Sequence, residues 1–174
     1  SLELKAANMP DFAQATRLIR GRRSVRQYRG ENVKTETVSE ILASVANSPT
    51  GCNYRKLKFT VIDNIDELKK FHAAIIAAVE KAHNEKRIPE ALSFVYDATD
   101  AWKQKGYDHI FRGAPHLLIV SAEKEAPTGQ EDVIIALSYF ELLATAAGLG
   151  AVWCGYLKFI FDVCPELKDM VGIP

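Results

Sequence analysis

The sequence predicts a single α+β domain over residues 1–174, with many helices and few strands. Apolar residues recur at helical spacing in several long segments, whereas only two short runs, 57–62 and 117–121, have the length and composition of strands. Long helical segments separate these strands without regular alternation, which favours α+β over a βαβ series. Gly148-Leu149-Gly150 follows a predicted helix rather than a strand, so it is not a dinucleotide-binding fingerprint.

Two helices are predicted before the first strand. Pro10 and Asp11 are typical of a helix start, and the apolar residues after them fall on one face: Phe12, Ala15, Leu18 and Ile19. Thr35 or Thr37 is expected to cap the second helix, whose apolar residues repeat at i, i+3, i+4 and i+7: Val38, Ile41, Leu42 and Val45. This helix is expected to end near Asn47, because a proline two residues later disfavours helical backbone.

The middle of the chain is predicted to hold both strands and one further helix. The strand 57–62 is followed by an amphipathic helix over 66–83. The segment 84–106 is polar with isolated aromatic residues, and it is interpreted as an excursion or lid. Pro115 precedes the second strand, 117–121, which is short and apolar.

The last third of the chain is the most apolar. The helix predicted over 130–147 is apolar on most sides, so it is expected to be the central buried helix, with Gly148 as its C-terminal stop. A short apolar segment, 151–157, follows. Pro165 is expected to open a last helical turn that closes at Gly172.

Composition excludes several classes of protein. The 22 basic residues balance 22 acidic ones, which argues against bulk affinity for nucleic acid or membranes. The three cysteines, Cys52, Cys154 and Cys164, have no C-x-x-C spacing, so neither a zinc site nor an iron–sulfur cluster is expected. No signal-peptide pattern and no membrane-spanning apolar run appear. These features predict a cytoplasmic protein without a metal, membrane or nucleic-acid partner.

The sharpest local feature is basic. Between Arg17 and Arg29 lie six arginines and no acid. The core of this stretch, Arg22-Arg23-Ser24-Val25-Arg26, offers planar guanidinium forks and a hydroxyl donor that suit phosphate oxygens. An anion site is therefore predicted, although a solvated basic face or a nucleic-acid patch would have the same composition.

Two other segments are rich in small residues. The loop Ser48-Pro49-Thr50-Gly51-Cys52-Asn53-Tyr54-Arg55 can present backbone N–H groups and an amide to a heteroaromatic edge. The segment Gly148-Leu149-Gly150-Ala151-Val152-Trp153-Cys154-Gly155-Tyr156 allows a flat ligand to approach the backbone closely. Each segment could equally be an ordinary connection. No acid–base or nucleophile constellation appears; His72 and His83 are expected on helix surfaces, and Cys52 and Cys154 in packing roles.

In this order and spacing, the three features resemble the nitroreductase family of flavoproteins. The family pattern is R-R-S-x-R, then P-S-x-x-N-x-Q-P-W, then G-L-G-x-x-W-x-G after a long central helix, and the resemblance spans nearly the whole chain. It implies an antiparallel sheet flanked by helices, an intertwined homodimer, and two FMN sites between the subunits.

The resemblance also implies three sets of cofactor-binding residues. Those that hold the FMN phosphate and ribityl chain are Arg22, Arg23, Ser24 and Arg26. Those that lie against the flavin, from the partner subunit, are Ser48, Pro49, Thr50 and Asn53. Those whose backbone N–H groups face the flavin N5 region are Gly155 and Tyr156. Donors at that position tune the electron density of the reduced flavin.

The chain departs from the family pattern at three places. Arg55 stands where the family has Gln, and Lys56 and Leu57 replace Pro-Trp, which implies a more cationic ring environment. The sequence stops at Pro174, before the family's C-terminal arm, which supplies a strand, contacts to the other subunit and often a cation for the phosphate; without that arm, weaker dimerisation and weaker FMN binding are expected. Residues 4–10 resemble the linker that follows a two-cluster ferredoxin domain in one branch of the family.

The implied activity is a ping-pong reaction. NAD(P)H or reduced ferredoxin reduces FMN, and an electron-poor small molecule, such as a nitroaromatic or a quinone, then accepts the electrons. No catalytic side-chain dyad is needed, because the cofactor carries the chemistry. Alternatives are a flavin-fragmenting synthase, a dehalogenase or a dehydrogenase acting on a peptide-derived ring, which would differ in the 84–106 lid. A non-enzymatic anion- or nucleic-acid-binding module built on the arginines is the alternative from another class.

Overall fold

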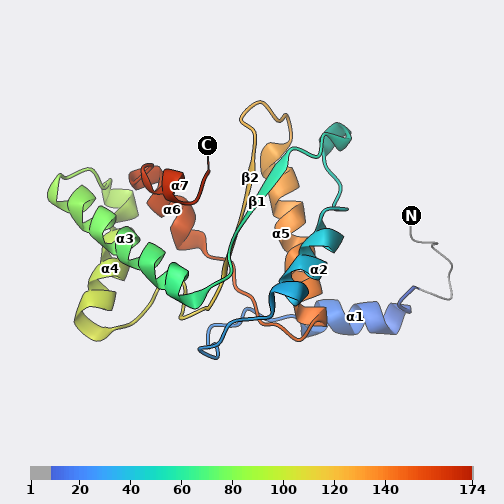
Figure 1. Ribbon diagram of the computed structural model, residues 1–174. Helices are drawn as coiled ribbons and strands as arrows, with labels where there is room; N and C mark the ends of the chain where they lie inside the picture. Colours follow the sequence, from blue (N-terminus) through green and yellow to red (C-terminus); the bar gives the residue numbers. More distant parts are fainter. Residues whose placement is uncertain (1–8, 174) are drawn as a thin grey trace.

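A small antiparallel sheet divides the protein into two helical layers. The computed structural model describes residues 9–173, so most of the predicted linker over 4–10 lies outside the described residues. In Figure 1, α2 and α5 lie on one side of the sheet, and α3, α4, α6 and α7 lie on the other. The elements in chain order are α1 (Phe12–Gly21), α2 (Thr35–Val45), the 3-10 turn η2 (Gly51–Asn53), β1 (Leu57–Ile62), α3 (Ile65–Asn84), the 3-10 turn η3 (Glu90–Leu92), α4 (Ser93–Lys105), β2 (Leu117–Ala122), α5 (Gly129–Ala146), α6 (Gly155–Val163) and α7 (Leu167–Met170).

The two predicted strands are confirmed. They pair antiparallel, with Leu57 opposite Ala122 and Ile62 opposite Leu117. Side chains alternate across a strand, and both faces of β2 are covered: Leu117 belongs to the core beside α3 and α6, and Val120 to the core beside α2 and α5. Burial on both faces explains why β2 is a continuous apolar run rather than an alternating one.

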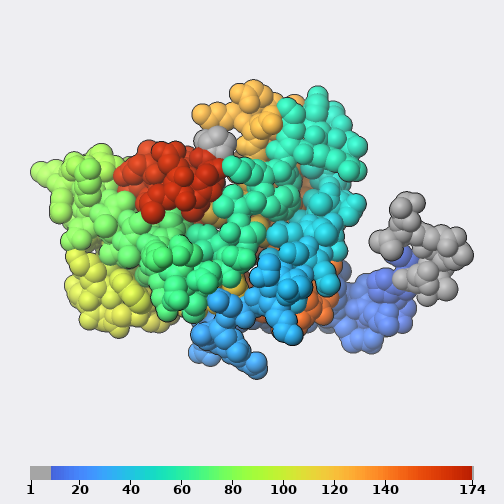
Figure 2. Space-filling view, in the orientation of Figure 1, coloured from blue at the N-terminus to red at the C-terminus, as the bar shows by residue number. Residues whose placement is uncertain are grey.

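Helix α1 begins as predicted and stands apart from the body. Asp11 caps it: the Gln14 N–H donates to Asp11 Oδ1 at 2.7 Å, and Asp11 N–H donates back to the Gln14 side chain at 3.0 Å. No residue of α1 is buried, and Phe12 and Ile19 are 87% and 62% exposed. Figure 2 shows this helix at the edge of the molecule. Phe12 and Ile19 on its apolar face therefore lack cover within the described chain, whereas Ala15 and Leu18 are half-buried.

The N-cap expected for α2 is wrong, whereas α3 has a side-chain N-cap. Thr35 is already helical, the N-cap is Lys34, and no side-chain cap is formed. The helix ends at Val45, shortly before Pro49. Asn64 caps α3: its side-chain oxygen accepts from the backbone N–H groups of Asp66 and Glu67 at 2.9 and 3.3 Å.

The segment interpreted as an excursion or lid, 84–106, is largely helical. The segment folds into η3 and α4, and α4 packs on α3 through Val95, Ala98 and Thr99, which are buried at helical spacing. Its remaining faces are polar and solvated, which hides this narrow apolar stripe in the composition. The apolar segment 151–157 likewise divides into a bridge at residue 151 and the start of α6.

Helix α5 packs on β2 and α2 without being enclosed by them. It spans Gly129–Ala146, and Gly148 ends it in the left-handed region with φ +76°, as predicted. Ile134 and Tyr139 remain 46% and 43% exposed, so the single chain does not bury this helix completely. None of the helices between residues 9 and 173 is both long and apolar enough to cross a lipid bilayer.

Two individual side chains differ from expectation. His72 is buried rather than on the surface of α3, because α4 and the 107–113 turn cover that face; its ring meets Trp102 and Phe111 edge-on, with centroids 4.8 and 5.6 Å away. Cys52 is exposed, so the packing role expected for it is wrong.

Candidate functional site

The arginine segment and the glycine-rich segment lie side by side. Ser24 and Ala151 form a parallel bridge, in which the Val25 N–H donates to the Ala151 carbonyl at 3.0 Å. A Cβ on Gly150 would lie 2.7 Å from the Val25 side chain, so only glycine permits this approach. The fold thus brings together two of the three predicted motifs.

A cavity of about 360 Å³ lies where these segments meet. Three predicted site residues line it: Arg26, Gly155 and Tyr156. The first N–H groups of a helix have no acceptor within the helix, and Gly155 and Tyr156 are the first two residues of α6. The cavity therefore combines a guanidinium with a helix N-terminus, an arrangement that favours anions and polar ring atoms.

The remaining arginines of the cluster have other partners in this structure. Arg22 Nη1 lies 2.9 Å from Glu141 Oε1, and the same carboxylate accepts from the Trp153 indole at 3.1 Å. Arg23 Nη1 donates to the carbonyls of Arg20 and Arg22 at 2.6 and 2.8 Å, near the C-terminus of α1. The hydroxyl-bearing Ser24 is exposed. Of the three predicted phosphate-binding arginines, Arg26 is the one that lines the cavity.

The loop predicted to lie against a ring is at the far end of α5. The Gly51 N–H donates to Asp132 Oδ1 at 3.0 Å, near the N-terminus of the helix, whereas Arg22 pairs with Glu141 nearer its C-terminus. Nine residues of α-helix correspond to about 13 Å along the axis. Within one chain, this third motif therefore does not join the other two.

The same loop holds an unusual concentration of left-handed backbone. Cys52, Asn53 and Arg55 have φ of 49°, 55° and 52°, a region that non-glycine residues rarely adopt. The conformation is held by Arg55, whose N–H donates to Thr50 Oγ1 at 3.0 Å and whose Nε donates to Asn53 Oδ1 at 2.9 Å. Such strain persists where the surroundings enforce it, and it gathers at functional sites.

The other predicted residues of this loop are set by its anchoring. Ser48 is buried at the end of α2 and its N–H donates to Val45, while Pro49 is exposed. A Cβ on Gly51 would lie 2.0 Å from the Thr128 hydroxyl, so the loop can approach α5 only with glycine there. Lys56, expected to add positive charge, forms an ion pair with Glu123 at 2.7 Å.

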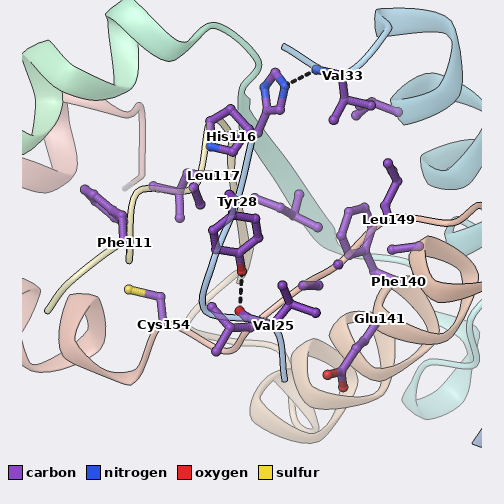
Figure 3. Close-up of a pocket in the computed structure, with 18 of the residues that line it drawn as sticks. Val25, Tyr28, Val33, Phe111, His116, Leu117, Phe140, Glu141, Leu149 and Cys154 are labelled. Atoms are coloured by element: carbon purple, nitrogen blue, oxygen red, sulfur yellow. Dashed lines mark hydrogen bonds between the residues drawn. The ribbon is translucent and has the colours of Figure 1, made fainter. Parts of the chain in front are cut away.

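A larger cavity of about 580 Å³ lies behind the arginine segment, between residues 25–33, β2 and the 148–154 segment (Figure 3). Its walls are mostly apolar. The Tyr28 hydroxyl donates to the Val25 carbonyl at 2.6 Å, and His116 Nε2 accepts from the Val33 N–H at 2.7 Å, whereas His116 Nδ1 is buried without a hydrogen-bond partner among residues 9–173. Burial raises the pKa of Cys154 to about 11, so its thiol stays protonated. None of the predicted site residues lines this cavity, whereas three of them line the smaller one.

Comparisons with known proteins identify the family of the chain. The sequence model of the Nitroreductase family matches residues 19–174. An iodotyrosine deiodinase of Thermotoga neapolitana is 26% identical over 135 residues, which cover 78% of this chain and 70% of that protein. A nitroreductase of Bacteroides fragilis with bound FMN has a TM-score of 0.74 at 24% identity, covering 92% of this chain and 81% of that one. An FMN-dependent nitroreductase of Mycobacterium smegmatis in complex with NADPH has a TM-score of 0.65 at 22% identity, covering 94% and 83%.

Proposed function

Because the chain belongs to the nitroreductase family, we propose that it is an FMN-dependent oxidoreductase that reduces electron-poor small molecules with electrons from NAD(P)H or a ferredoxin. One observation carries the proposal: Arg26 is far in sequence from Gly155 and Tyr156, yet all three line one cavity. A phosphate needs a cation, and a flavin ring needs N–H donors, and these three positions supply both.

The residues of this cavity fit FMN. Arg26 binds the phosphate; Ser24 and Arg23, in the same segment, add donors, and Arg22 joins them by exchanging its Glu141 partner. The N–H groups of Gly155 and Tyr156 donate to polar atoms of the ring. When bound, FMN takes up two electrons from the donor and passes them to the acceptor. The aromatic walls exclude water, and donor and acceptor occupy the cavity in turn.

We further propose a homodimer in which each site is shared between subunits. The exposed apolar residues on α1 and α5 need cover: Phe12, Ile19, Ile134 and Tyr139. A two-fold interface places each patch of one copy against the other copy. Because the 48–55 loop is at the opposite end of α5 from the cavity, a two-fold partner supplies it where a single chain does not.

Subunit mixing tests the shared site. Arg26→Gln and Asn53→Ala damage different subunits' contributions, so each homodimer has two impaired sites. A mixed dimer has one intact site and one doubly impaired site. At an FMN concentration low enough that each homodimeric variant has little activity, statistical mixing of the two impaired variants should restore about one quarter of full activity. If both residues act within one chain, mixing restores nothing, and the shared site is refuted.

The visible spectrum of the purified protein tests the function itself. We expect flavin absorption at one FMN per chain, bleaching on anaerobic addition of NADH, NADPH or reduced ferredoxin, and recovery on addition of a nitroaromatic or quinone. Comparing the three donors identifies the physiological class. A colourless protein that FMN cannot reconstitute would instead support the anion-binding module.

A second candidate, reductive dehalogenation, is favoured by the 26% identity to the Thermotoga neapolitana deiodinase. Two electrons and a proton would replace an aromatic carbon–iodine bond by carbon–hydrogen and release iodide. Iodide release from iodotyrosine by the reduced, FMN-loaded protein decides between the candidates, because nitroaromatic reduction releases none.

A further inference from the structure

A second arginine lines the small cavity, and the cofactor proposal does not use it. Arg112 lies in the turn between α4 and β2 and is half-buried. It lies with Arg26 and His109 in a lining that contains no Asp or Glu among the described residues. The cavity therefore holds a second guanidinium beside the one assigned to the phosphate.

The charge of Arg112 is not balanced by an acid within residues 9–173. Its Nη1 donates to the Tyr107 hydroxyl at 2.8 Å, and its Cζ lies 5.5 Å from the centroid of the same ring. Both interactions are with a neutral group. Asp108, the nearest acid in the turn, accepts instead from the N–H groups of Ile110, Phe111 and Gly113 at 2.8–2.9 Å. The guanidinium thus keeps donors for a ligand.

The turn fixes the backbone at Arg112, whose side chain lines the cavity. Arg112 and Gly113 both have left-handed backbone, with φ of 59° and 73°, and the three bonds to Asp108 stabilise that shape. Tyr107, beneath the guanidinium, is 52% exposed. A cation placed there meets a molecule that enters from solvent.

The walls of the cavity suit a flat ring. Phe94 meets Tyr156 and Phe159 edge-on, with centroids 5.7 and 5.3 Å apart, and His109 is 6.4 Å from Tyr156. Aromatic walls bind a ring by dispersion and edge-to-face contact, and they carry no charge of their own. Their combination with a guanidinium that has no acidic partner among residues 9–173 would suit a ring that bears an anionic group.

We propose that Arg112 determines acceptor specificity by binding the carboxylate of an aromatic electron acceptor. The assignment rests on the proposed function, in that the cavity serves the reaction of a bound flavin. Arg26 and Arg112 then divide the two anions between them: Arg26 takes the phosphate of the cofactor, and Arg112 takes the carboxylate of the acceptor.

A matched pair of ligands tests this. The compounds 4-nitrobenzoate and 4-nitrobenzamide have similar shape and differ in charge, and benzoate and benzamide are their counterparts without the reducible group. Calorimetric titration of FMN-loaded protein should give a lower dissociation constant for benzoate than for benzamide. The KM should likewise be lower for 4-nitrobenzoate than for 4-nitrobenzamide. Arg112→Gln should lower the ratio of acid affinity to amide affinity by about 10-fold to 100-fold, with amide binding unchanged. Arg112→Lys should restore part of it, and Lys105→Gln, an exposed cation at the end of α4, should change neither.

The outcomes separate the two proposals. If Arg112→Gln weakens acid and amide equally, or weakens FMN binding and leaves the acid-to-amide ratio unchanged, the assignment of Arg112 is overturned. If the wild-type protein binds FMN but reduces neither nitro compound, the proposed activity fails, and the calorimetric ratio still decides whether Arg112 selects an anionic ring.

Discussion

Replacing Arg26 by Gln should weaken FMN binding more than any other single change in the arginine cluster. Arg26 lines the cavity at the N-terminus of α6, whereas Arg22 is paired with Glu141 and Arg23 with backbone carbonyls. Glutamine keeps a polar side chain of moderate length and removes the charge. The change therefore tests the charge of Arg26 rather than its bulk.

The magnitude follows from the bond that is lost. A hydrogen bond to a charged group contributes about 1.5–3 kcal/mol, which corresponds to a change of about 10- to 100-fold in dissociation constant. Arg26 is exposed in the single chain, so solvent screening places the expected effect near the lower end. The effect should shrink as salt rises, because the Debye length is only about 8 Å at physiological ionic strength.

The assay is a titration of apoprotein with FMN, followed by flavin fluorescence at low and high salt. Arg29→Gln is the matched control: it removes the same charge three residues later, from a side chain that is 91% exposed and only 3.8 Å from Glu31. Equal dissociation constants for the wild type and Arg26→Gln, or equal losses in both variants, would refute the role given to Arg26.

Three further predictions concern stability and thiol chemistry. Glu141→Gln should lower the free energy of unfolding by about 0.5–1.5 kcal/mol and the Tm by about 1–6 °C. The carboxylate is 13% exposed, and the substitution removes its ion pair with Arg22, although glutamine can still accept from Trp153. An unchanged Tm at low salt would contradict this. Burial lowers the pKa of His72, and the nearby Asp108 carboxylate opposes this shift. As the pH falls, the unfolded chain therefore takes up the proton at a higher pH than the folded chain. The free energy of unfolding should keep its value above about pH 6.5 and fall as the pH drops below it. In urea unfolding, His72→Gln should reduce this dependence of the free energy of unfolding on pH, whereas His83→Gln, at an exposed position, should not. A residual dependence should remain from His116, because burial also lowers its pKa. In a Cys52→Ser background, the folded protein should react very slowly with a disulfide reagent at about pH 8, because burial raises the pKa values of Cys154 and Cys164, that of Cys154 to about 11; prompt reaction without unfolding would show that the site opens.

Local features were readable because their causes lie within a few residues. The helix start at Asp11 and the stop at Gly148 each depend on a single turn of chain. The strand 57–62 was readable from a short apolar run. Helix α4 was missed because three buried residues among thirteen leave a polar composition. The helical start at Gly155 was missed because an apolar run of that length fits strand or helix equally.

The sequence by itself determined the family and the candidate cavity residues Arg26, Gly155 and Tyr156, which follow from short ordered motifs. It also determined the α+β class, which follows from helical periodicity and two short apolar runs. The tertiary structure alone decided which groups pair with the residues of these motifs. Arg22 meets Glu141 across 119 residues and Gly51 meets Asp132 across 81, and such partners are chosen by how the helices pack on the sheet. The same packing separated the 48–55 loop from the cavity and brought Arg112 into it. Electrostatic balance is a property of distance in space, so a charge in the sequence acquires its role only when the fold supplies or withholds its partner.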